Sequence, residues 1–382
     1  MKRRLVILTE IISPYRIPLF NALARQGSVE LHVIFLAETD AGLRQWQVYK
    51  EEIKFSYQVL PSWRTRLDGY SILLNRGVGR ALQAAAPNAI LCGGYNYIAS
   101  WQALWWSRRN RVSFLLWSES NLRDTRSGNT FVEFLKSEFI RKCSGFVVPG
   151  RSAREYLRGR RVKDDLIFTA PNAVDNDLFA AGAGQARHKN LTIRQELRLP
   201  ARYFLFVGRL VPEKGVFDLL SAYAKLSDSI REQVGLVFVG EGVARRRLEE
   251  QAAGVSPGTV QFVGFAQRDQ LPAYYALSEA LILPTHTEPW GLVVNEAMAC
   301  GVPVILSEVA GCAADLVTDN WNGLLVPPND RAALETSMTK IATDSELRIS
   351  MAAGARERVS AYSAEEWAAG IERAVLIGSD HA

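Results

Sequence analysis

The stretch "THTEPWGLVVNEAMACGVPVI" (residues 285–305) joins a loop, a helix and a buried strand within one short segment. Proline pushes the residue before it out of the α region, so we expect Glu288 to lie in a loop. The helix is then predicted to begin near Gly291, with Glu296 on its first turns, and to stop at the glycine before the final Pro-Val-Ile. Both carboxylates flank a helix N-terminus, where unpaired backbone N–H groups attract anions. The stretch therefore predicts an anion site with two acids placed to bind neighbouring hydroxyls.

Short, nearly continuous apolar runs alternate with helical patterns on both sides of this stretch. Such runs are typical of parallel strands that helices cover on both faces. In chain order they read RLVILT, ELHVIFL, AILCGG, SFLLWS, GFVVPG, DLIFTAP, YFLFVGR, GLVFVGEG, VQFVGF, ALILPT, PVILS and GLLVPP. A small, polar segment at 180–190 separates two sets of runs. The pattern predicts an α/β protein with two doubly wound domains, residues 1–180 and 181–363.

The composition is that of a globular protein, with 48% hydrophobic and 22% charged residues over 382 positions. The four cysteines form no CxxC pair, and the four histidines are scattered, so we expect reduced thiols and no metal site. The N-terminal MKRRLVILTEIISPYR is predicted to be a buried strand rather than a signal peptide, because Glu10 interrupts its apolar run. No apolar run approaches membrane-spanning length. These features favour a cytoplasmic protein.

The net charge of +5 is unevenly distributed. Residues 1–180 hold 26 Lys and Arg against 16 Asp and Glu, whereas 181–382 hold 19 against 24. The excess is densest in RSAREYLRGRRVK (151–163). An anionic membrane surface, an anionic acceptor or nucleic acid would fit such a field, and a solvated basic helix explains it equally well. We favour an anionic membrane surface and expect the protein to lie peripherally on the inner face of the membrane. We expect no nucleic acid as a partner.

A second basic stretch, YIASWQALWWSRRNR (97–111), combines aromatic and cationic side chains. It places three tryptophans before three arginines, namely Trp101, Trp105, Trp106, Arg108, Arg109 and Arg111. Tryptophan beside arginine is typical of helices that lie at a membrane interface. A packed helix with a basic end explains the pattern at least as well, so both interpretations stay open.

Two cations are predicted at the carboxyl end of a strand in YFLFVGRLVPEKGV (203–216). Gly208 falls at the end of the strand, where α/β sheets bind ligands, and Arg209 and Lys214 follow it. Together with the helix N-terminus near Gly291, two cations can hold a diphosphate without a metal ion. Each cation taken alone would be explained as an ordinary loop residue.

Gly240 and Gly242 follow the next strand, in GLVFVGEGVARRRLE (235–249). The segment fails the dinucleotide fingerprint because Arg245 stands where the third glycine is expected, and this disfavours a dehydrogenase. The two glycines still allow a close approach of the backbone to the base or ribose of a nucleotide. Phe265, at the end of the following strand, is predicted to line the same pocket.

Polar and aromatic side chains also end three strands of the N-terminal half. Tyr15 and Arg16 lie in ISPYRIPLFNAL, Tyr95 lies in GGYNYIASW, and Glu119 and Asp124 lie in WSESNLRD. We expect these segments to form a rim that faces the second domain and binds an acceptor. Glu119 is a candidate acid or base, whereas Asp124 is better explained as a turn residue or helix cap.

The C-terminal half resembles the nucleotide-sugar domain of the family 4 glycosyltransferases, which have the GT-B fold. The resemblance rests on VGRLVPEKG, VGEG, FVGF, EPWGLVVNEAMACGVPVI and NGLLVPPND, and it covers roughly residues 170–375. It implies two Rossmann-like domains facing across a cleft, an acceptor domain (1–180) and a donor domain (181–363). It also implies that the final helix, 364–382, crosses back to the N-terminal domain.

The resemblance further implies a role for each matching residue of the donor domain. Arg209 and Lys214 would hold the donor diphosphate. Glu288 would meet the hydroxyls of the transferred sugar, and Glu296 would meet the ribose. The resemblance also implies that the phosphates meet three backbone amides, those of Gly291, Leu292 and Val293.

The N-terminal half departs from the family pattern. The first loop reads SPYRIP where many members have a glycine-rich loop, and Ser118-Glu119-Ser120 occupies the place of a histidine near the sugar. The resemblance therefore assigns no catalytic role to Glu119 and no acceptor to this half. The donor base and the sugar are also left unassigned.

The resemblance implies a retaining glycosyltransferase, and we expect a UDP- or GDP-sugar as the donor. We also expect no cofactor and no metal ion, because Arg209, Lys214 and the helix N-terminus can meet the charge of the diphosphate. We expect a glycan or lipid-linked acceptor, in the synthesis of a bacterial surface polysaccharide or glycolipid. The chain has no D-x-D pair at a strand end, since DND (175–177) lies in a loop where turn chemistry explains it better. Two alternatives are a nucleotide-sugar epimerase on the same fold and a non-catalytic two-lobed binder of sugars or nucleotides.

Overall fold

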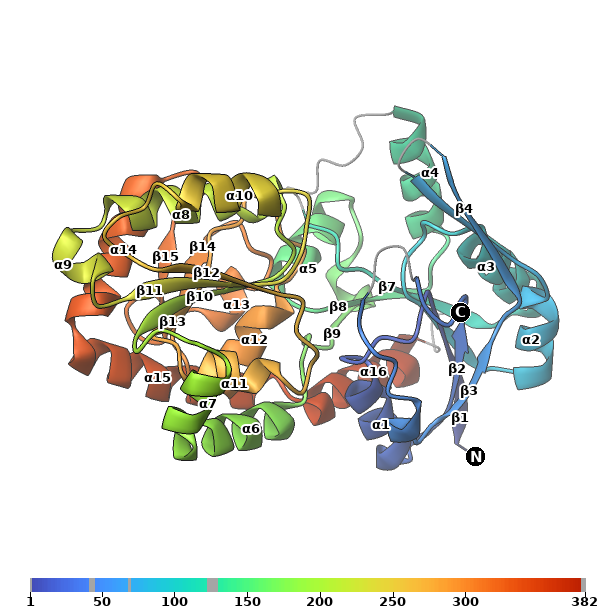
Figure 1. Cartoon of the computed structure of the whole chain (residues 1–382). Coiled ribbons are helices and arrows are strands. Elements are labelled where there is room, and N and C mark those ends of the chain that lie inside the picture. The colour runs from blue at the N-terminus through green and yellow to red at the C-terminus, as the bar shows by residue number, and fades with distance from the viewer. Residues whose placement is uncertain (1, 41–44, 68–69, 122–129, 379–382) are drawn as a thin grey trace. The chain divides into compact units, whose positions relative to one another are not determined.

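The computed structural model divides the chain into two compact units (Figure 1). It describes residues 2–40, 45–67, 70–121 and 130–378. The N-terminal unit comprises 1–172 and 364–382, and the C-terminal unit comprises 173–363. The boundary falls before Ala173 rather than at residue 180, because Phe179 is buried in the core of the C-terminal unit. Asp124 lies outside the described residues.

A parallel seven-stranded sheet forms the centre of the N-terminal unit, in the order β3-β2-β1-β6-β7-β8-β9. Its strands are β1 (Arg3–Thr9), β2 (Val29–Phe35), β3 (Ser56–Val59), β6 (Ala89–Cys92), β7 (Ser113–Trp117), β8 (Gly145–Val148) and β9 (Ile167–Thr169). The accompanying helices are α1 (Ile17–Gln26), η1 (Lys50–Glu52), α2 (Val78–Ala85), α3 (Ile98–Asn110), α4 (Thr130–Arg141), α5 (Arg151–Gly159), η2 (Asp164–Leu166) and α16 (Ala364–Gly378). All six apolar runs predicted in this half are strands, because both faces of the sheet are covered.

Three strands of the N-terminal unit are absent from the sequence prediction. β3 extends the sheet at its edge, while β4 (Ser62–Leu67) and β5 (Tyr70–Asn75) form a separate antiparallel pair. β3 and β4, which read SYQV and SWRTRL, mix polar and aromatic residues instead of forming an apolar run. Solvent on one side therefore removes the continuous apolar signal on which the prediction depended.

The C-terminal unit contains a parallel six-stranded sheet in the order β12-β11-β10-β13-β14-β15. Its strands are β10 (Tyr203–Val207), β11 (Gly235–Val239), β12 (Val260–Gly264), β13 (Ala280–Leu283), β14 (Val304–Ser307) and β15 (Gly323–Val326). Its helices are α6 (Asn176–His188), α7 (Asn190–Glu196), η3 (Pro212–Lys214), α8 (Val216–Lys225), α9 (Asp228–Arg231), α10 (Arg245–Ala252), α11 (Leu271–Ala276), α12 (Leu292–Ala299), α13 (Ala313–Leu316), α14 (Arg331–Thr343) and α15 (Ser345–Ser360). All six predicted runs of this half are strands, so both units are doubly wound and Rossmann-like.

The final helix α16 is part of the N-terminal unit, where it packs beside α1. Its Trp367 is fully buried, with ring centroids 5.7 Å from Phe20 of α1 and 5.3 Å from Trp117 of β7. The chain therefore closes the core of its first unit with its last helix. No helix of the described residues is both long and apolar enough to cross a membrane.

Trp367→Ala should destabilise the N-terminal unit by about 3–5 kcal/mol, the usual cost of truncating a buried aromatic side chain. Urea unfolding followed by far-UV circular dichroism measures the change. Leu376→Ala, at an exposed position of the same helix, is the control and should shift the midpoint little. Equal losses in the two variants would contradict the role of Trp367 as a core residue.

Candidate functional site

Two loops of the C-terminal unit meet because β10 and β13 are neighbouring parallel strands. Leu205 of β10 pairs with Leu281 of β13, so the carboxyl ends of both strands lie at the same edge of the sheet. The loop after β10 carries Arg209 and Lys214, and the loop after β13 carries Glu288. The strand pairing thus brings together charged residues that are far apart in the sequence.

Lys214 and Glu288 form an ion pair between these loops. The ammonium of Lys214 donates to Oε2 of Glu288, and each side chain is only 14% exposed. In such an enclosed position the attraction between opposite charges is stronger than in water. An anionic ligand that binds Lys214 would compete with Glu288 for its ammonium group.

Hydrogen bonds to the backbone of the first loop and to a side chain of α8 hold the second loop in place. Thr285 Oγ1 and the backbone N–H of His286 both donate to the carbonyl oxygen of Glu213, at 3.0 and 2.9 Å. The ring Nε2 of His286 lies 2.6 Å from Oδ2 of Asp218 on α8, and Arg331 Nε donates to Oδ1 of the same carboxylate at 2.6 Å. These contacts fix the peptide segments from which Lys214 and Glu288 project.

Asp218 joins three elements of this site. Desolvation opposes ionisation of its carboxyl, yet the hydrogen bonds from Arg331 and His286 outweigh it and lower the pKa of Asp218 below its ordinary value. The sequence prediction missed Asp218 and His286. Asp218 looks like an ordinary residue in the first turn of a helix, and only the tertiary structure places His286 beside it.

The helix α12 begins where the sequence predicts, with Gly291 as its N-cap at φ 104°. The amides of Gly291, Leu292 and Val293 lie at the helix N-terminus, where the first N–H groups have no acceptor within the helix. Trp290 Nε1 donates to Asn295 Oδ1 at 2.9 Å, and this buried bond fixes the entry of the chain into the helix. The geometry suits an anion at the helix N-terminus.

Glu296 lies half-buried on the second turn of α12. Desolvation raises the pKa of its carboxyl to about 7, although Tyr275 Oη donates to Oε2 at 2.6 Å and acts in the opposite direction. The carboxyl therefore changes its charge near neutral pH. Tyr275, a fully buried residue of α11, is a second neighbour of the site that the sequence prediction missed.

The remaining residues predicted to bind a donor differ in their surroundings. Arg209 is exposed, and no described residue is paired with its guanidinium. A Cβ on Gly240 would lie 1.9 Å from the carbonyl oxygen of Gly208, and one on Gly242 would lie 2.3 Å from that of Leu210. Both glycines are thus required where the loops after β10 and β11 cross, quite apart from any ligand.

Phe265 is 41% exposed beyond the end of β12. Phe262, three residues earlier, instead stacks on Phe238 with ring centroids 5.1 Å apart. Core packing accounts for Phe262, whereas the ring of Phe265 is accessible to a ligand. Its place in a donor pocket stays a prediction.

In the N-terminal unit, Arg16 and Glu119 form an ion pair that brings together two of the predicted acceptor residues. Arg16 donates to Glu119 Oε1 at 2.6 Å, and Asn172 Nδ2 donates to the same oxygen at 3.1 Å. The guanidinium of Arg16 also lies 3.9 Å from the ring centroid of Trp117. The carboxylate is therefore held by two donors, and Asn172 joins the group although the sequence prediction did not include it.

The two predicted tyrosines make separate contacts. Tyr95 Oη lies 3.3 Å from Ser120 Oγ, and the ring of Tyr15 packs edge-on to Trp46 at 5.8 Å. A further group that the sequence prediction missed lies in the same unit, where Arg64 donates to Glu10 at 3.1 Å and to Asp40 at 2.7 Å. The polar contacts of this unit thus form small clusters around arginines.

No described residues form a cluster of three or more His, Cys, Asp or Glu side chains that could hold a metal ion. Asp175, the first acid of the Asp-Asn-Asp segment, is the N-cap of α6 and accepts a hydrogen bond from the backbone N–H of Leu178 at 3.0 Å. As the sequence suggested, turn and cap chemistry explains this acid.

Comparison with known proteins finds matches to glycosyltransferases. Residues 189–358 match the family model described as glycosyl transferases group 1. Over 209 residues the chain is 32% identical to a D-inositol 3-phosphate glycosyltransferase of Salinispora arenicola, which covers 52% of this chain and 46% of that protein. An uncharacterized glycosyltransferase of Methanocaldococcus jannaschii is 33% identical over 145 residues, or 37% of this chain and 36% of that protein. The chain spans about half the length, or less, of these curated relatives.

The fold is similar to that of solved glycosyltransferases. The crystal structure of the Anabaena protein HepE in complex with UDP and glucose has a TM-score of 0.76 at 18% identity, and the match covers 97% of this chain and 98% of that one. Sucrose-phosphate synthase from Thermosynechococcus elongatus has a TM-score of 0.70 at 23% identity, with the same coverage. The chain therefore has the GT-B fold that the resemblance implied.

Replacing Glu296 by Gln should change how stability depends on pH. The pKa of about 7 in the folded chain lies above the ordinary value of 4.5, so this group's contribution to stability is lost as the pH rises from about 4.5 to 7. Gln does not ionise, so the variant should gain in Tm relative to the parent between about pH 5 and pH 8. Glu357→Gln, at an exposed site on α15, is the control. Parallel Tm curves for Glu296→Gln and the parent would show that the carboxyl is not desolvated.

Proposed function

We propose that the protein moves a sugar from a nucleoside diphosphate donor to an acceptor hydroxyl, and the match of residues 189–358 to the family model of the group 1 glycosyl transferases supports this. The observation that carries the proposal is the meeting of Lys214, Glu288 and the N-terminus of α12 at the edge of one sheet. Cations and helix amides suit the diphosphate, and a carboxylate suits the sugar. The C-terminal unit is accordingly the donor domain.

In this proposal the diphosphate is bound by Arg209, Lys214 and the amides at residues 291–293. Negative charge grows on the diphosphate as the glycosidic bond breaks, and fixed cations and N–H donors stabilise it without rearrangement. Glu288, released from Lys214, accepts hydrogen bonds from the sugar hydroxyls, and Glu296 accepts them from the ribose. UDP and glucose in the complex of the Anabaena neighbour support a UDP-sugar as the donor.

The transfer is proposed to retain the anomeric configuration and to need no metal ion. The departing phosphate oxygen takes the proton of the acceptor hydroxyl, so no separate base is required. In the N-terminal unit, the ion pair of Arg16 with Glu119 offers both a cation and a carboxylate to acceptor hydroxyls. We assign Glu119 to acceptor binding together with Tyr15 and Tyr95, and not to proton transfer.

The acceptor is proposed to be a glycan or a lipid-linked glycan of the bacterial cell surface. The excess of Lys and Arg over Asp and Glu in residues 1–180, 26 against 16, supports work on an anionic membrane surface from the cytoplasmic side. Release of the nucleoside diphosphate on addition of a glycan acceptor, but not without it, is the test. Sugar interconversion without an acceptor would instead indicate the epimerase, and binding without turnover would indicate the non-catalytic binder.

Lys214→Ala should lower kcat on the order of 100-fold or more, the scale for removing one preorganised electrostatic donor. The change also leaves Glu288 without its ion-pair partner, so steady-state kinetics must be accompanied by a Tm measurement. Lys225→Ala, at an exposed site at the end of α8, removes the same charge away from the loops and is the control. A Lys214→Ala enzyme that is folded and fully active would rule out the diphosphate role of this lysine.

Transfer should survive excess EDTA, because the charge of the diphosphate is met by Arg209, Lys214 and the helix N-terminus. Initial rates with and without EDTA, and then with added Mg²⁺ or Mn²⁺, measure this directly. We expect the rates to agree within about twofold. Removal of a catalytic metal ion would lower the rate far more, because such an ion stabilises the transition state by several kcal/mol. Loss of activity in EDTA that Mn²⁺ restores would overturn metal independence.

A further inference from the structure

The helix α3 (Ile98–Asn110) carries apolar side chains on two opposite faces. Ala99, Ala103 and Leu104 are buried against the N-terminal unit. On the solvent side, Ile98 is exposed and the indole of Trp105 is 66% exposed. A surface helix ordinarily places polar residues there, and a helix that is apolar on both sides is ordinarily covered on both.

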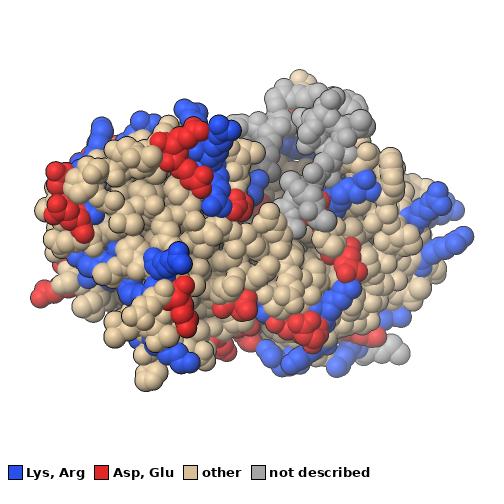
Figure 2. Space-filling view, viewed as in Figure 1, with Lys and Arg blue, Asp and Glu red and all other residues tan. Residues whose placement is uncertain are grey.

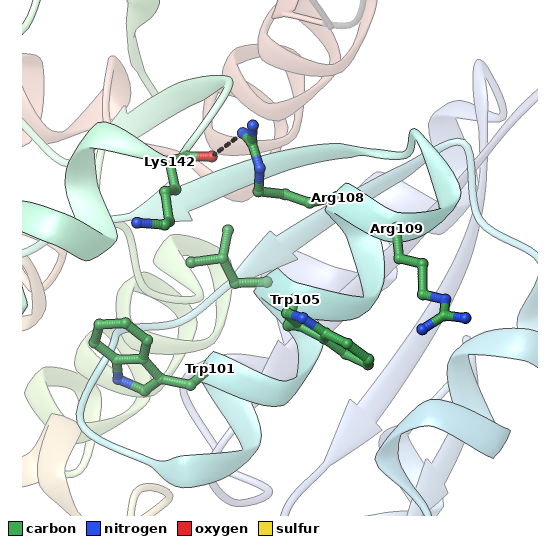
Figure 3. Close-up of a pocket in the computed structure, with 6 residues that line it drawn as sticks. Trp101, Trp105, Arg108, Arg109 and Lys142 are labelled. Carbon is green, nitrogen blue, oxygen red and sulfur yellow. Dashed lines mark hydrogen bonds between the residues drawn. The ribbon is translucent and has the colours of Figure 1, made fainter.

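The solvent face of α3 borders a hollow of about 520 Å³ (Figure 3). It is lined by Trp101, Leu104, Trp105, Arg108 and Arg109 of α3 and by Lys142 just beyond α4. Trp101 is fixed, because its Nε1 donates to the Tyr95 carbonyl at 3.2 Å and its ring packs 4.9 Å from Phe139. Among the described residues, none of the core makes a comparable contact with Trp105.

Three cations lie near the indoles of this hollow. Arg108 reaches the carbonyl oxygen of Lys142 at 3.5 Å, and the guanidinium of Arg109 lies 5.5 Å from the ring centroid of Trp105. Figure 3 shows Arg108 and Lys142 together on one side of the two indoles. Lys142 shares its charge with Glu138 at 2.7 Å, whereas no described carboxylate pairs with Arg108 or Arg109. The helix C-terminus attracts cations by itself, but it does not explain an exposed tryptophan beside them.

The basic segment 151–163, which the sequence singled out for an anionic surface, is less available. Arg154 and Arg158 both pair with Asp164, at 2.7 and 2.8 Å, and Arg160 pairs with Glu133. Figure 2 shows Lys and Arg side chains projecting at the side of the N-terminal unit where Figure 1 places α2 and α3. The unpaired arginines of α3 are therefore better candidates for an external anion than the paired arginines of α5.

We propose that the solvent face of α3 docks on an anionic phospholipid bilayer. This surface, the α3 patch, consists of Ile98, Trp101, Trp105, Arg108, Arg109 and Lys142. The indole of Trp105 has the apolar body and polar N–H that suit the bilayer interface, and the cations meet lipid phosphates. This inference rests on the proposed function, since the α3 patch would be the surface through which the enzyme contacts the membrane. Lipid binding itself needs neither a sugar donor nor glycosyl transfer.

Co-sedimentation of the full chain with vesicles tests this inference without any sugar substrate. Vesicles of phosphatidylcholine mixed with phosphatidylglycerol should bind more protein than phosphatidylcholine alone, and salt should weaken the binding by screening. Arg108→Gln combined with Arg109→Gln should reduce the binding constant by about 30-fold, the product of two cation contacts. Trp105→Ala should also reduce binding, and it should lose a blue shift of tryptophan fluorescence that the parent shows with anionic vesicles.

Two controls change matched residues elsewhere. Leu191→Ala alters an apolar side chain that is 78% exposed on α7, and Arg246→Gln removes a charge from a side chain that is 92% exposed on α10. Both should bind vesicles like the parent.

Equal binding to neutral and anionic vesicles, or losses no larger than those of the controls, would overturn the inference. So would binding of inorganic phosphate at the patch without vesicle binding, or a dimer in solution that Trp105→Ala dissociates. Glycosyl transfer to a soluble acceptor should persist in all α3-patch variants, so failure of docking and failure of the proposed activity can be told apart.

Discussion

The parallel pairing of β10 with β13 is the constraint on which the candidate site depends. The register places the carboxyl ends of the two strands side by side, so the loop with Lys214 must meet the loop with Glu288. Two hydrogen bonds to the Glu213 carbonyl and the contact of His286 with Asp218 then hold the loops together. The loop with Glu288 leads directly into α12, whose N-terminus completes an anion site. One strand pairing thus fixes cation, carboxylate and helix dipole relative to one another.

Local sequence patterns predicted those helices and strands that are determined by neighbouring residues in the sequence. Twelve apolar runs predicted twelve strands, most of which are buried on both faces. The Pro-Trp-Gly break predicted the start of α12 and put Glu288 outside the helix. The strands β3 and β4 were missed because their sequences, SYQV and SWRTRL, lack a continuous apolar run. β5, which reads YSILLN, was missed although it contains a short apolar run.

Side-chain partners far apart in the sequence could not be predicted from spacing. Asp218 and His286 are 68 residues apart, and Arg16 and Glu119 are 103 apart, so only the folded sheets bring them together. Charge counting had a related weakness. It located the basic half correctly, but it could not tell that two arginines of α5 share an ion pair with Asp164. The arginines at the end of α3 have no carboxylate partner among the described residues.

The central claim is that Arg209, Lys214 and the N-terminus of α12 form a diphosphate site that needs no metal ion. Calorimetric titration of UDP, GDP and ADP, each beside its nucleoside in metal-free buffer, tests it most directly. The claim predicts that one nucleoside diphosphate binds on the order of 100-fold more tightly than its nucleoside, since two hydrogen bonds to charged groups contribute at least about 1.5 kcal/mol each. No binding by any of the three, or equal affinity for a nucleoside and its diphosphate, would contradict it.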